Sequence, residues 1–180
     1  MIPVIVLSNR GPKYLPQCIE SIEKYLVGIA DILVLRDYEH VGYTKMMQKV
    51  VEVGRALNSD VLFVEEDWTF VRDVDASDLS EQLHADATLA QVRVSRAPYF
   101  PIERRKGVAG AWWPSGWTCN PSLVRREIFT AYDWPDQQWS EQAFGELLTS
   151  NGHRFGIYGD EREPLVEHIG VERVETSHGY

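Results

Sequence analysis

The chain has 180 residues, of which 44% are hydrophobic and 25% charged, a composition typical of one globular domain with its own core. Its net charge of −9 argues against general affinity for the nucleic-acid backbone, and no apolar run is long enough to cross a bilayer. The two cysteines have no metal-ligand spacing and the N-terminus lacks a basic leader, so we expect a reducing, cytoplasmic location and no membrane partner.

The first 65 residues alternate apolar runs with helical periodicity. Continuous apolar runs that end in turn residues are typical of strands buried in a parallel sheet, and apolar residues three and four positions apart predict helices. We expect buried strands at 3–8, 30–37 and 60–65, with helices at 13–26 and 43–58. This β-α-β-α-β order predicts an α/β fold with a doubly wound, Rossmann-like, mostly parallel sheet flanked by helices.

The rest of the chain is expected to complete the same domain. We expect, in chain order, a capped helix at 75–87, a strand at 88–95, a loop lining a site at 96–118, helices at 120–132 and 139–152, a strand at 153–159 and a strand-like stretch at 164–173. Pro121 suits the first turn of one of these helices, and Gly152 predicts the end of the other.

The charge along the chain is uneven. The segment from Arg93 to Glu127 carries seven basic and two acidic residues, so it is +5 while the remainder is −14. A basic segment that also contains tryptophans is one way to receive an anion, and solvated loop charges are the alternative.

Three consecutive carboxylates, Glu65, Glu66 and Asp67, follow the apolar run 61–64. Hard divalent cations such as Mg²⁺ or Mn²⁺ favour carboxylate oxygens, and Mg²⁺ usually takes only one or two from protein together with phosphates from a substrate. Because alternate residues of a strand point the same way, we expect Glu65 and Asp67 to share one side and Glu66 to face the other. Acids that only improve solubility at a strand end are the alternative.

His168 follows a second apolar, strand-like stretch near the end of the chain. A neutral imidazole is a suitable Mn²⁺ ligand, although a histidine of this kind also occurs as a structural residue. The case for a metal site therefore depends on the order of the pieces: acid cluster, a later acid on a helix, then histidine.

This order resembles the GT-A glycosyltransferases, especially the large family of inverting enzymes that use nucleotide-diphosphate sugars. The segments that carry the resemblance are PVIVLSNRGPKYLPQCIESI (3–22), DILVLRD (31–37), VLFVEEDW (61–68), GWTCNPSLVRREIF (116–129), WSEQAFGELLTSNGHRFGIY (139–158) and VEHIG (166–170). The resemblance covers nearly the whole chain. It departs from the family where glutamates replace the usual aspartates of the metal motif, where Arg36 precedes Asp37, and where Ser140 replaces the first acid of a pair.

The resemblance implies transfer of a sugar from a nucleotide-diphosphate donor to an acceptor hydroxyl with inversion. It implies one domain, residues 1–180, with a nucleotide-sugar-binding half at 1–92 and an acceptor and catalytic half at 93–180. Counting back from Gly152 sets Glu141 at the family's catalytic base; an exposed acid favoured by the helix dipole is the alternative. It also implies that Glu65, Asp67 and His168 bind Mn²⁺ or Mg²⁺, with Asp67 the strongest candidate.

Further residues are candidates for binding the two substrates. The donor candidates are Ser8, Asn9, Arg10, Asp37, Lys45 and Glu66. Among them, Asp37 suits a pyrimidine N–H, with a turn-forming acid as the alternative. Trp112, Trp113 and Trp117 are candidates for an apolar platform under an acceptor, with core packing as the alternative.

The acceptor class and the reaction class stay open at this point. The acceptor is a saccharide, a small molecule or a modified nucleobase, and a nucleobase in DNA would have to be flipped from its duplex. One competing function is a nucleotidyltransferase, although LSNRGPKY lacks the usual glycine-rich phosphate loop. The other is a non-catalytic module that binds a nucleotide sugar or a saccharide.

Overall fold

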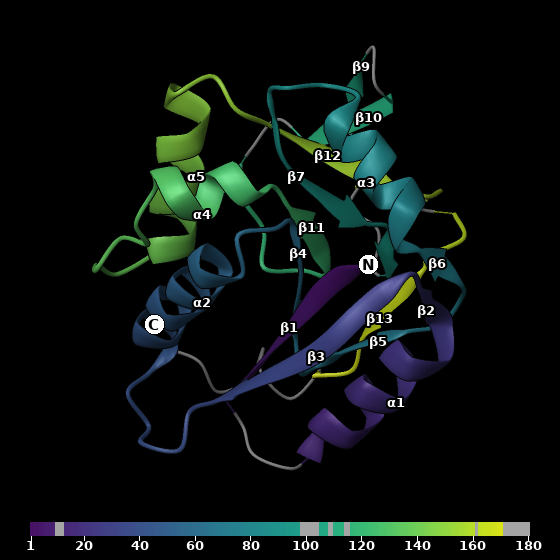
Figure 1. Cartoon of the computed structure of the whole chain (residues 1–180), viewed down its shortest axis with the longest axis horizontal. Coiled ribbons are helices and arrows are strands. Elements are labelled where there is room, and N and C mark those ends of the chain that lie inside the picture. Colours follow the sequence, from purple (N-terminus) through teal and green to yellow (C-terminus); the bar gives the residue numbers. More distant parts are fainter. Residues whose placement is uncertain (10–12, 98–104, 108–109, 114–115, 161, 171–180) are drawn as a thin grey trace.

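The computed structural model describes residues 1–9, 13–97, 105–107, 110–113, 116–160 and 162–170, with only the backbone for 105–107 and 110–113. The strands of its main sheet are, in chain order, β1 (Ile2–Ser8), β3 (Ile29–Arg36), β4 (Val61–Glu65), β7 (Leu89–Val94), β9 (Arg105–Gly107), β10 (Gly110–Trp113), β11 (Ser122–Val124) and β12 (Arg154–Tyr158). The order across this eight-stranded sheet is β3-β1-β4-β11-β7-β12-β10-β9 (Figure 1).

The main sheet is largely parallel. β1 runs parallel to β3 and β4, and β7 runs parallel to β12. β11 is antiparallel to both of its neighbours, and β10 is antiparallel to β12 and β9. All strands except β10 and β11 therefore point the same way, which confirms the predicted doubly wound α/β class.

In the described part of the chain, two small sheets and five helices complete the fold. The small sheets pair β5 (Trp68–Phe70) and β8 (Arg96–Ala97) with β13 (Val166–His168), and β2 (Leu26–Val27) with β6 (Val74–Asp75). The helices are α1 (Leu15–Tyr25), α2 (Tyr43–Leu57), α3 (Ala76–His84), α4 (Arg126–Ala131) and α5 (Ser140–Ser150).

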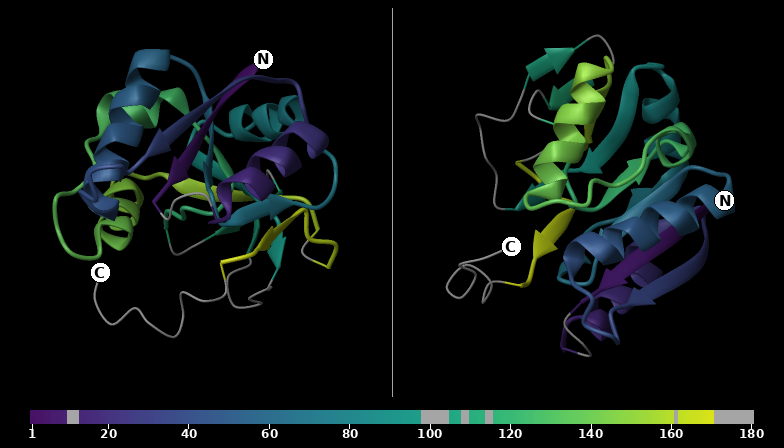
Figure 2. Two further views of the ribbon diagram at one scale, coloured as in Figure 1. Left: turned by 90° about the horizontal axis from the view of Figure 1, so that it is seen from below. Right: turned by 90° about the vertical axis from the view of Figure 1, so that its left-hand side faces the viewer.

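The helices form a layer on each face of the sheet (Figure 1, Figure 2). α1 and α3 contribute to one buried apolar cluster, and α2, α4 and α5 contribute to the other. β4 supplies both clusters, with Leu62 and Val64 in the first and Val61 and Phe63 in the second. The continuous apolar run that predicted a strand covered on both faces is thereby explained.

Two predicted elements differ from the structure. The strand at 30–37 was expected to be buried, but β3 is the edge of the sheet and none of its residues is fully buried. The helix at 120–132 begins only at Arg126, because Ser122–Val124 form β11, inserted between β4 and β7. Burial between two strands outweighs the helical spacing of these three residues.

The predicted loop at 96–118 contains β8, β9 and β10. β10 pairs with β12 and extends the main sheet. The backbone of Trp112 and Trp113 therefore belongs to a strand, and the side chains of these two residues lie outside the described part of the chain.

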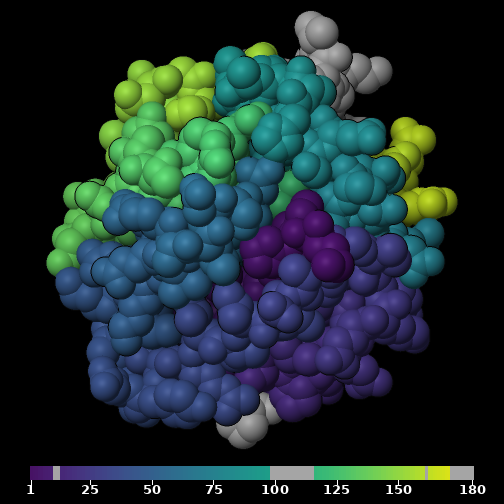
Figure 3. Space-filling model, in the orientation of Figure 1, coloured from purple at the N-terminus to yellow at the C-terminus, as the bar shows by residue number. Residues whose placement is uncertain are grey.

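α5 lies very close to the segment that precedes β11. A Cβ added at Gly145 would lie 2.7 Å from the backbone nitrogen of Trp117, so only glycine allows this approach. In Figure 3 the side chains of α2 adjoin those of the segment 116–150, and Arg55 Nε donates to the carbonyl of Phe129 at 2.9 Å. These contacts hold α5 against the segment before β11 and the last turn of α2 against α4.

In the described part of the chain, no helix combines the length and the apolar character that spanning a bilayer requires.

Candidate active site

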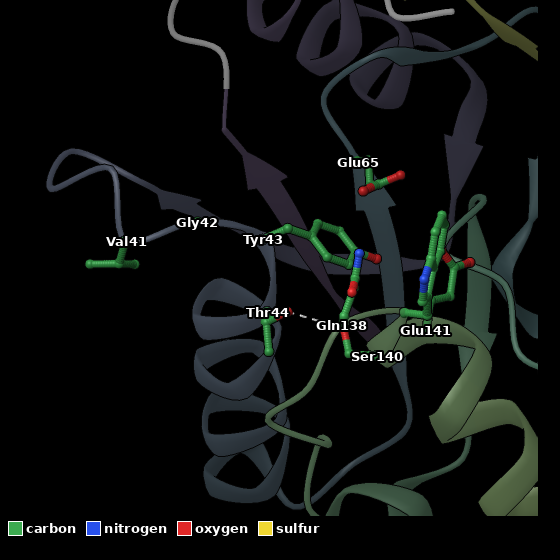
Figure 4. Close-up of a pocket in the computed structure, with 9 residues that line it drawn as sticks. Val41, Gly42, Tyr43, Thr44, Glu65, Gln138, Ser140 and Glu141 are labelled. Atoms are coloured by element: carbon green, nitrogen blue, oxygen red, sulfur yellow. Dashed lines mark hydrogen bonds between the residues drawn. The ribbon is translucent and has the colours of Figure 1, made fainter. Parts of the chain in front are cut away.

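A cavity of about 390 Å³ opens where the starts of α2 and α5 meet the end of β4 (Figure 4). Its lining residues are Val41, Gly42, Tyr43, Thr44, Glu65, Gln138, Trp139, Ser140 and Glu141. The hydroxyls of Thr44 and Ser140 lie 3.2 Å apart and join the two helix starts. The cavity sits at the carboxyl end of a parallel strand, where α/β sheets usually bind ligands.

Glu141 lies in the first turn of α5, at the cavity. Its Oε1 accepts a hydrogen bond from the backbone N–H of Cys119 at 2.9 Å, which fixes the carboxylate against the segment before β11. Burial raises the pKa of Glu141, and neither the Cys119 N–H nor the charge of Arg96 cancels this effect. A carboxylate with a raised pKa is better matched to proton transfer near neutral pH than an exposed one.

Cys119 and Tyr43 support Glu141. The Tyr43 hydroxyl donates to Cys119 Sγ at 2.7 Å, and Trp117 Nε1 donates to the same sulfur at 3.4 Å. Burial raises the pKa of Cys119 well above its ordinary value, with further increases from the charges of Glu141 and Glu65. Burial also raises the pKa of the Tyr43 hydroxyl. Both groups therefore stay protonated, and Cys119 has the properties of a structural thiol.

The three acids of the cluster lie in three different environments. Glu65 is the last residue of β4 and lines the cavity, and Figure 4 shows its side chain on the same side as those of Tyr43 and Glu141. Glu66 is buried and accepts from the Ser8 hydroxyl at 2.6 Å and from the Asn9 backbone N–H at 2.8 Å. Glu66 therefore joins the ends of β1 and β4.

Asp67 is 2% exposed and lies beside His168, with 3.2 Å between Oδ2 and Nε2. β5 and β13 pair Trp68 with His168, and the Ile169 N–H donates to the Asp67 carbonyl at 2.8 Å. A Cβ at Gly170 would lie 2.6 Å from Asp67 Oδ2, so the chain passes close to this carboxylate. Asp67 and His168, 101 residues apart and both predicted as metal ligands, thus lie side by side.

Glu65 does not share a side with Asp67 as expected. The strand ends at Glu65, so the alternation that would have aligned the two carboxylates stops there. Within the described ranges, no three His, Cys, Asp or Glu side chains come together as a metal-binding group. A carboxylate–imidazole pair still fits a divalent cation whose other ligands are phosphate oxygens and water.

The other donor candidates have partners within the protein. Both carboxylate oxygens of Asp37 accept backbone N–H groups, from Val41 at 2.8 Å and Gly42 at 3.0 Å. Burial opposes the ionisation of Asp37, but these two N–H groups outweigh it and lower the pKa. Lys45 forms an exposed ion pair with Asp136 at 2.7 Å. Arg10 lies outside the described residues.

Trp117 does not form an acceptor platform. It is 8% exposed, and its ring packs edge-on against Trp134 and Phe144 in the core. The exposed tryptophan at the cavity is Trp139, which the sequence analysis missed. Its position directly before Ser140 and Glu141 was the available signal.

Three described arginines of the basic segment contact other parts of the protein. Arg93 is 2% exposed within β7, and Arg96 lies over the Trp68 ring at 6.0 Å. Arg125 donates from Nε to the Leu89 carbonyl at 2.7 Å and also to the carbonyls of Leu83 and Asp86, so it binds backbone oxygens near the end of α3. These three arginines are therefore not the solvated loop charges of the alternative interpretation, and anion binding by the segment stays a prediction.

Solved structures share this architecture. TarS 1–349 from S. aureus matches 96% of the chain with a TM-score of 0.62 and 14% identity. The chain has a GT-A-type fold. A glycosyltransferase involved in glycosylation of the major capsid of PBCV-1 matches 96% of both chains (TM-score 0.56, 10% identity), and A197 from STIV matches 89% of this chain and 87% of its own (TM-score 0.56, 13% identity).

The likeness to these solved structures is a likeness of fold. The chain spans 61% of TarS 1–349, which has also been solved in complex with UDP. No protein-family model matches the sequence, and no curated protein matches it significantly. At identities of 10–14%, these likenesses concern the fold, and any activity has to be argued from the site.

Proposed function

We propose that the protein is a metal-dependent, inverting glycosyltransferase that moves a sugar from a nucleotide-diphosphate donor to an acceptor hydroxyl, with Glu141 as general base. The observation that carries this proposal is the position of Glu141: a carboxylate with a raised pKa, held by the Cys119 N–H, at a cavity beside the end of β4. The GT-A fold supports it, as does the UDP complex of one solved neighbour.

The reaction needs a base for the acceptor. As the acceptor oxygen attacks the anomeric carbon, its proton must leave, and the bond from that carbon to the diphosphate oxygen breaks on the opposite face. One oxygen of Glu141 accepts the Cys119 N–H, which leaves the other to take this proton. Because the N–H orients the carboxylate, little conformational entropy is lost when the acceptor binds.

The reaction also needs positive charge near the leaving diphosphate. Asp67 and His168 would hold a Mn²⁺ or Mg²⁺ ion, which would supply Lewis-acid stabilisation of the leaving group. Ser8, Asn9 and Glu66 join the adjacent strand ends, and Asp37 shapes the loop before α2 through Val41 and Gly42. We propose that these strand ends bind the donor nucleotide.

The test is a release assay with the purified chain and a panel of nucleotide-diphosphate sugars, with Mn²⁺, with Mg²⁺ and with EDTA. A glycosyltransferase releases nucleoside diphosphate, a nucleotidyltransferase releases pyrophosphate, and a binding module raises the melting temperature without forming either product. The anomeric configuration of the product, measured by NMR, tests inversion.

The variant Glu141→Gln separates binding from catalysis. We expect it to keep the donor-induced thermal shift and to lose roughly 10²- to 10⁴-fold in kcat, the usual contribution of a general base. Glu146→Gln is the matched control, because Glu146 is an exposed residue of the same helix outside the cavity. A Glu141→Gln variant with the kcat of the original protein would show that Glu141 is not the base.

A further inference from the structure

Trp139 is an exposed indole at the cavity. Its exposed fraction is 65%, whereas Trp68, Trp117 and Trp134, whose side chains the structure also describes, are buried. Burying an aromatic side chain is one of the largest single gains in folding, so an exposed one gives up that stabilisation. Trp139 lines the cavity two residues before the proposed base.

The backbone of Trp139 is also unfavourable. It lies in the left-handed region, with φ 58° and ψ 37°, which costs a non-glycine residue about 1–2 kcal/mol. It occupies the N-cap of α5, a position that favours serine, threonine, aspartate or asparagine, and its side chain makes no capping hydrogen bond. Neither the helix nor the core explains a tryptophan here, and residues held in such conformations often serve a function.

The charges around Trp139 limit what the cavity binds. Glu65 and Glu141 both line it, and its described lining contains no lysine or arginine. Two described cations outside the lining have partners: Lys45 is paired with Asp136, and Arg96, whose charge acts on Glu141, lies over the Trp68 ring. Two carboxylates repel phosphate groups and accept hydrogen bonds from hydroxyls, so they favour a neutral polyol over a phosphorylated ligand or a nucleic-acid backbone.

We propose that Trp139 is the binding platform for the acceptor, and that the acceptor is a neutral sugar ring. The ring lies with its C–H face on the indole while its hydroxyls bond to Glu65 and Glu141. This inference rests on the proposed glycosyl transfer and narrows its acceptor to one class. An acceptor is favoured over the donor because, of the described residues assigned to donor or metal, only Glu65 lines the cavity.

The experiment uses Trp139→Gly and Trp139→Asn, two residues that tolerate the left-handed region. Both variants remove the platform while relieving the backbone, so the melting temperature should stay level or rise by roughly 2–4 °C. The KM for a neutral saccharide acceptor should rise roughly tenfold or more, with kcat and the donor KM unchanged. Trp139→Phe keeps an aromatic ring and should retain part of the acceptor affinity.

Leu147→Ala is the matched control, because Leu147 is an exposed apolar residue of α5 outside the cavity. The acceptor panel pairs neutral mono- and disaccharides with their 6-phosphates, and we expect the neutral members to be the better acceptors. Saturation-transfer NMR with the same saccharides measures binding directly, so the platform is tested even if the chain turns over no donor.

Several results would overturn the proposal. An unchanged acceptor KM and unchanged NMR contacts in both Trp139 variants would show that the indole binds no sugar. A rise in the donor KM or in the UDP dissociation constant would place the donor, not the acceptor, on the ring. Higher activity with phosphorylated saccharides or with nucleic acid than with neutral saccharides would refute a neutral sugar as the acceptor. Absence of any donor turnover by the unmodified chain counts against glycosyl transfer and leaves the NMR result to decide on the platform.

Discussion

Gly145→Ala tests whether the close approach of α5 to the segment before β11 holds Glu141 in place. The added Cβ would lie 2.7 Å from Trp117 N and 3.3 Å from the Cα of Gly116, whereas ordinary contact begins at 3.4 Å. Both neighbours are backbone atoms, so the helix and the segment must separate by about 0.7 Å. If this shift moves Glu141 Oε1 away from Cys119 N, the distance between the two atoms lengthens from 2.9 Å to about 3.6 Å, which is beyond hydrogen-bond range.

The expected magnitudes follow from this shift. Overpacking costs about 1–3 kcal/mol, and alanine regains about 1 kcal/mol of helix propensity, so we expect the free energy of unfolding to fall by about 0–2 kcal/mol. For a chain of this size, that lowers the melting temperature by up to roughly 8 °C. A displaced base should lower kcat by up to roughly 10²-fold.

The assay combines thermal unfolding with steady-state kinetics, and Gly54→Ala is the control. A Cβ at Gly54 would lie 2.7 Å from the buried ring of Phe129, away from the cavity, so this variant should lose stability and keep its kcat. In the double variant with Glu141→Gln, Gly145→Ala should add little further loss of kcat, because it acts through the residue already changed. An equal fall in kcat for both glycine variants would refute the reasoning.

Three further predictions concern the site. Glu141 has a raised pKa, so kcat/KM should rise with pH to a plateau through a value above the ordinary 4.5, and Glu141→Gln should lack this limb. Because the folded state favours the neutral carboxyl, the contribution of Glu141 to stability should be present at low pH and be lost as pH rises through its folded pKa, so Glu141→Gln should gain in melting temperature over the original chain at pH 7.5 and not at pH 4. Glu66→Ala leaves two donors at the end of β1, the Ser8 hydroxyl and the Asn9 N–H, without their acceptor and should lower the free energy of unfolding by about 1.5–3 kcal/mol in urea titration, while an unchanged value would contradict its structural role. Asp67→Asn and His168→Gln should each raise the Mn²⁺ concentration for half-maximal activity by roughly tenfold or more, and equal metal dependence in all three proteins would rule out this pair as ligands.

The first half of the fold was predictable from sequence because local and tertiary signals agree there. The apolar run of β4 matches its burial on both faces, and the helical spacing of α2 matches its packing in the second cluster. β11 was missed because its strand state depends on insertion between β4 and β7, which no local pattern encodes. β3 was placed correctly, but its position at the sheet edge depends on strand order.

Candidate site residues that the order of motifs locates could be named from the sequence. Candidates that depend on which side chains are exposed could not. The order of motifs pointed to Glu141, Asp67 and His168, and the structure has Glu141 at the cavity and Asp67 beside His168, while their catalytic and metal roles are proposals. Trp117, a candidate for an acceptor platform, is buried, because composition does not distinguish it from the exposed Trp139, where we propose the platform. Only the three-dimensional packing of Trp117 against Phe144 separates the two.

The acid cluster shows why three adjacent carboxylates are tolerated at one strand end. Because β4 ends at Glu65, the three carboxylates lie in different places. Glu65 lines the cavity, Glu66 accepts hydrogen bonds at the end of β1, and Asp67 lies beside His168. Hydrogen bonds to Glu66 and the imidazole beside Asp67 offset the repulsion that three parallel acids would suffer. One short sequence thus joins the strand ends, supplies a carboxylate to the proposed metal pair and places another opposite the proposed base. A substitution at any one of the three should therefore affect a different measurement: stability for Glu66, metal dependence for Asp67 and acceptor binding for Glu65.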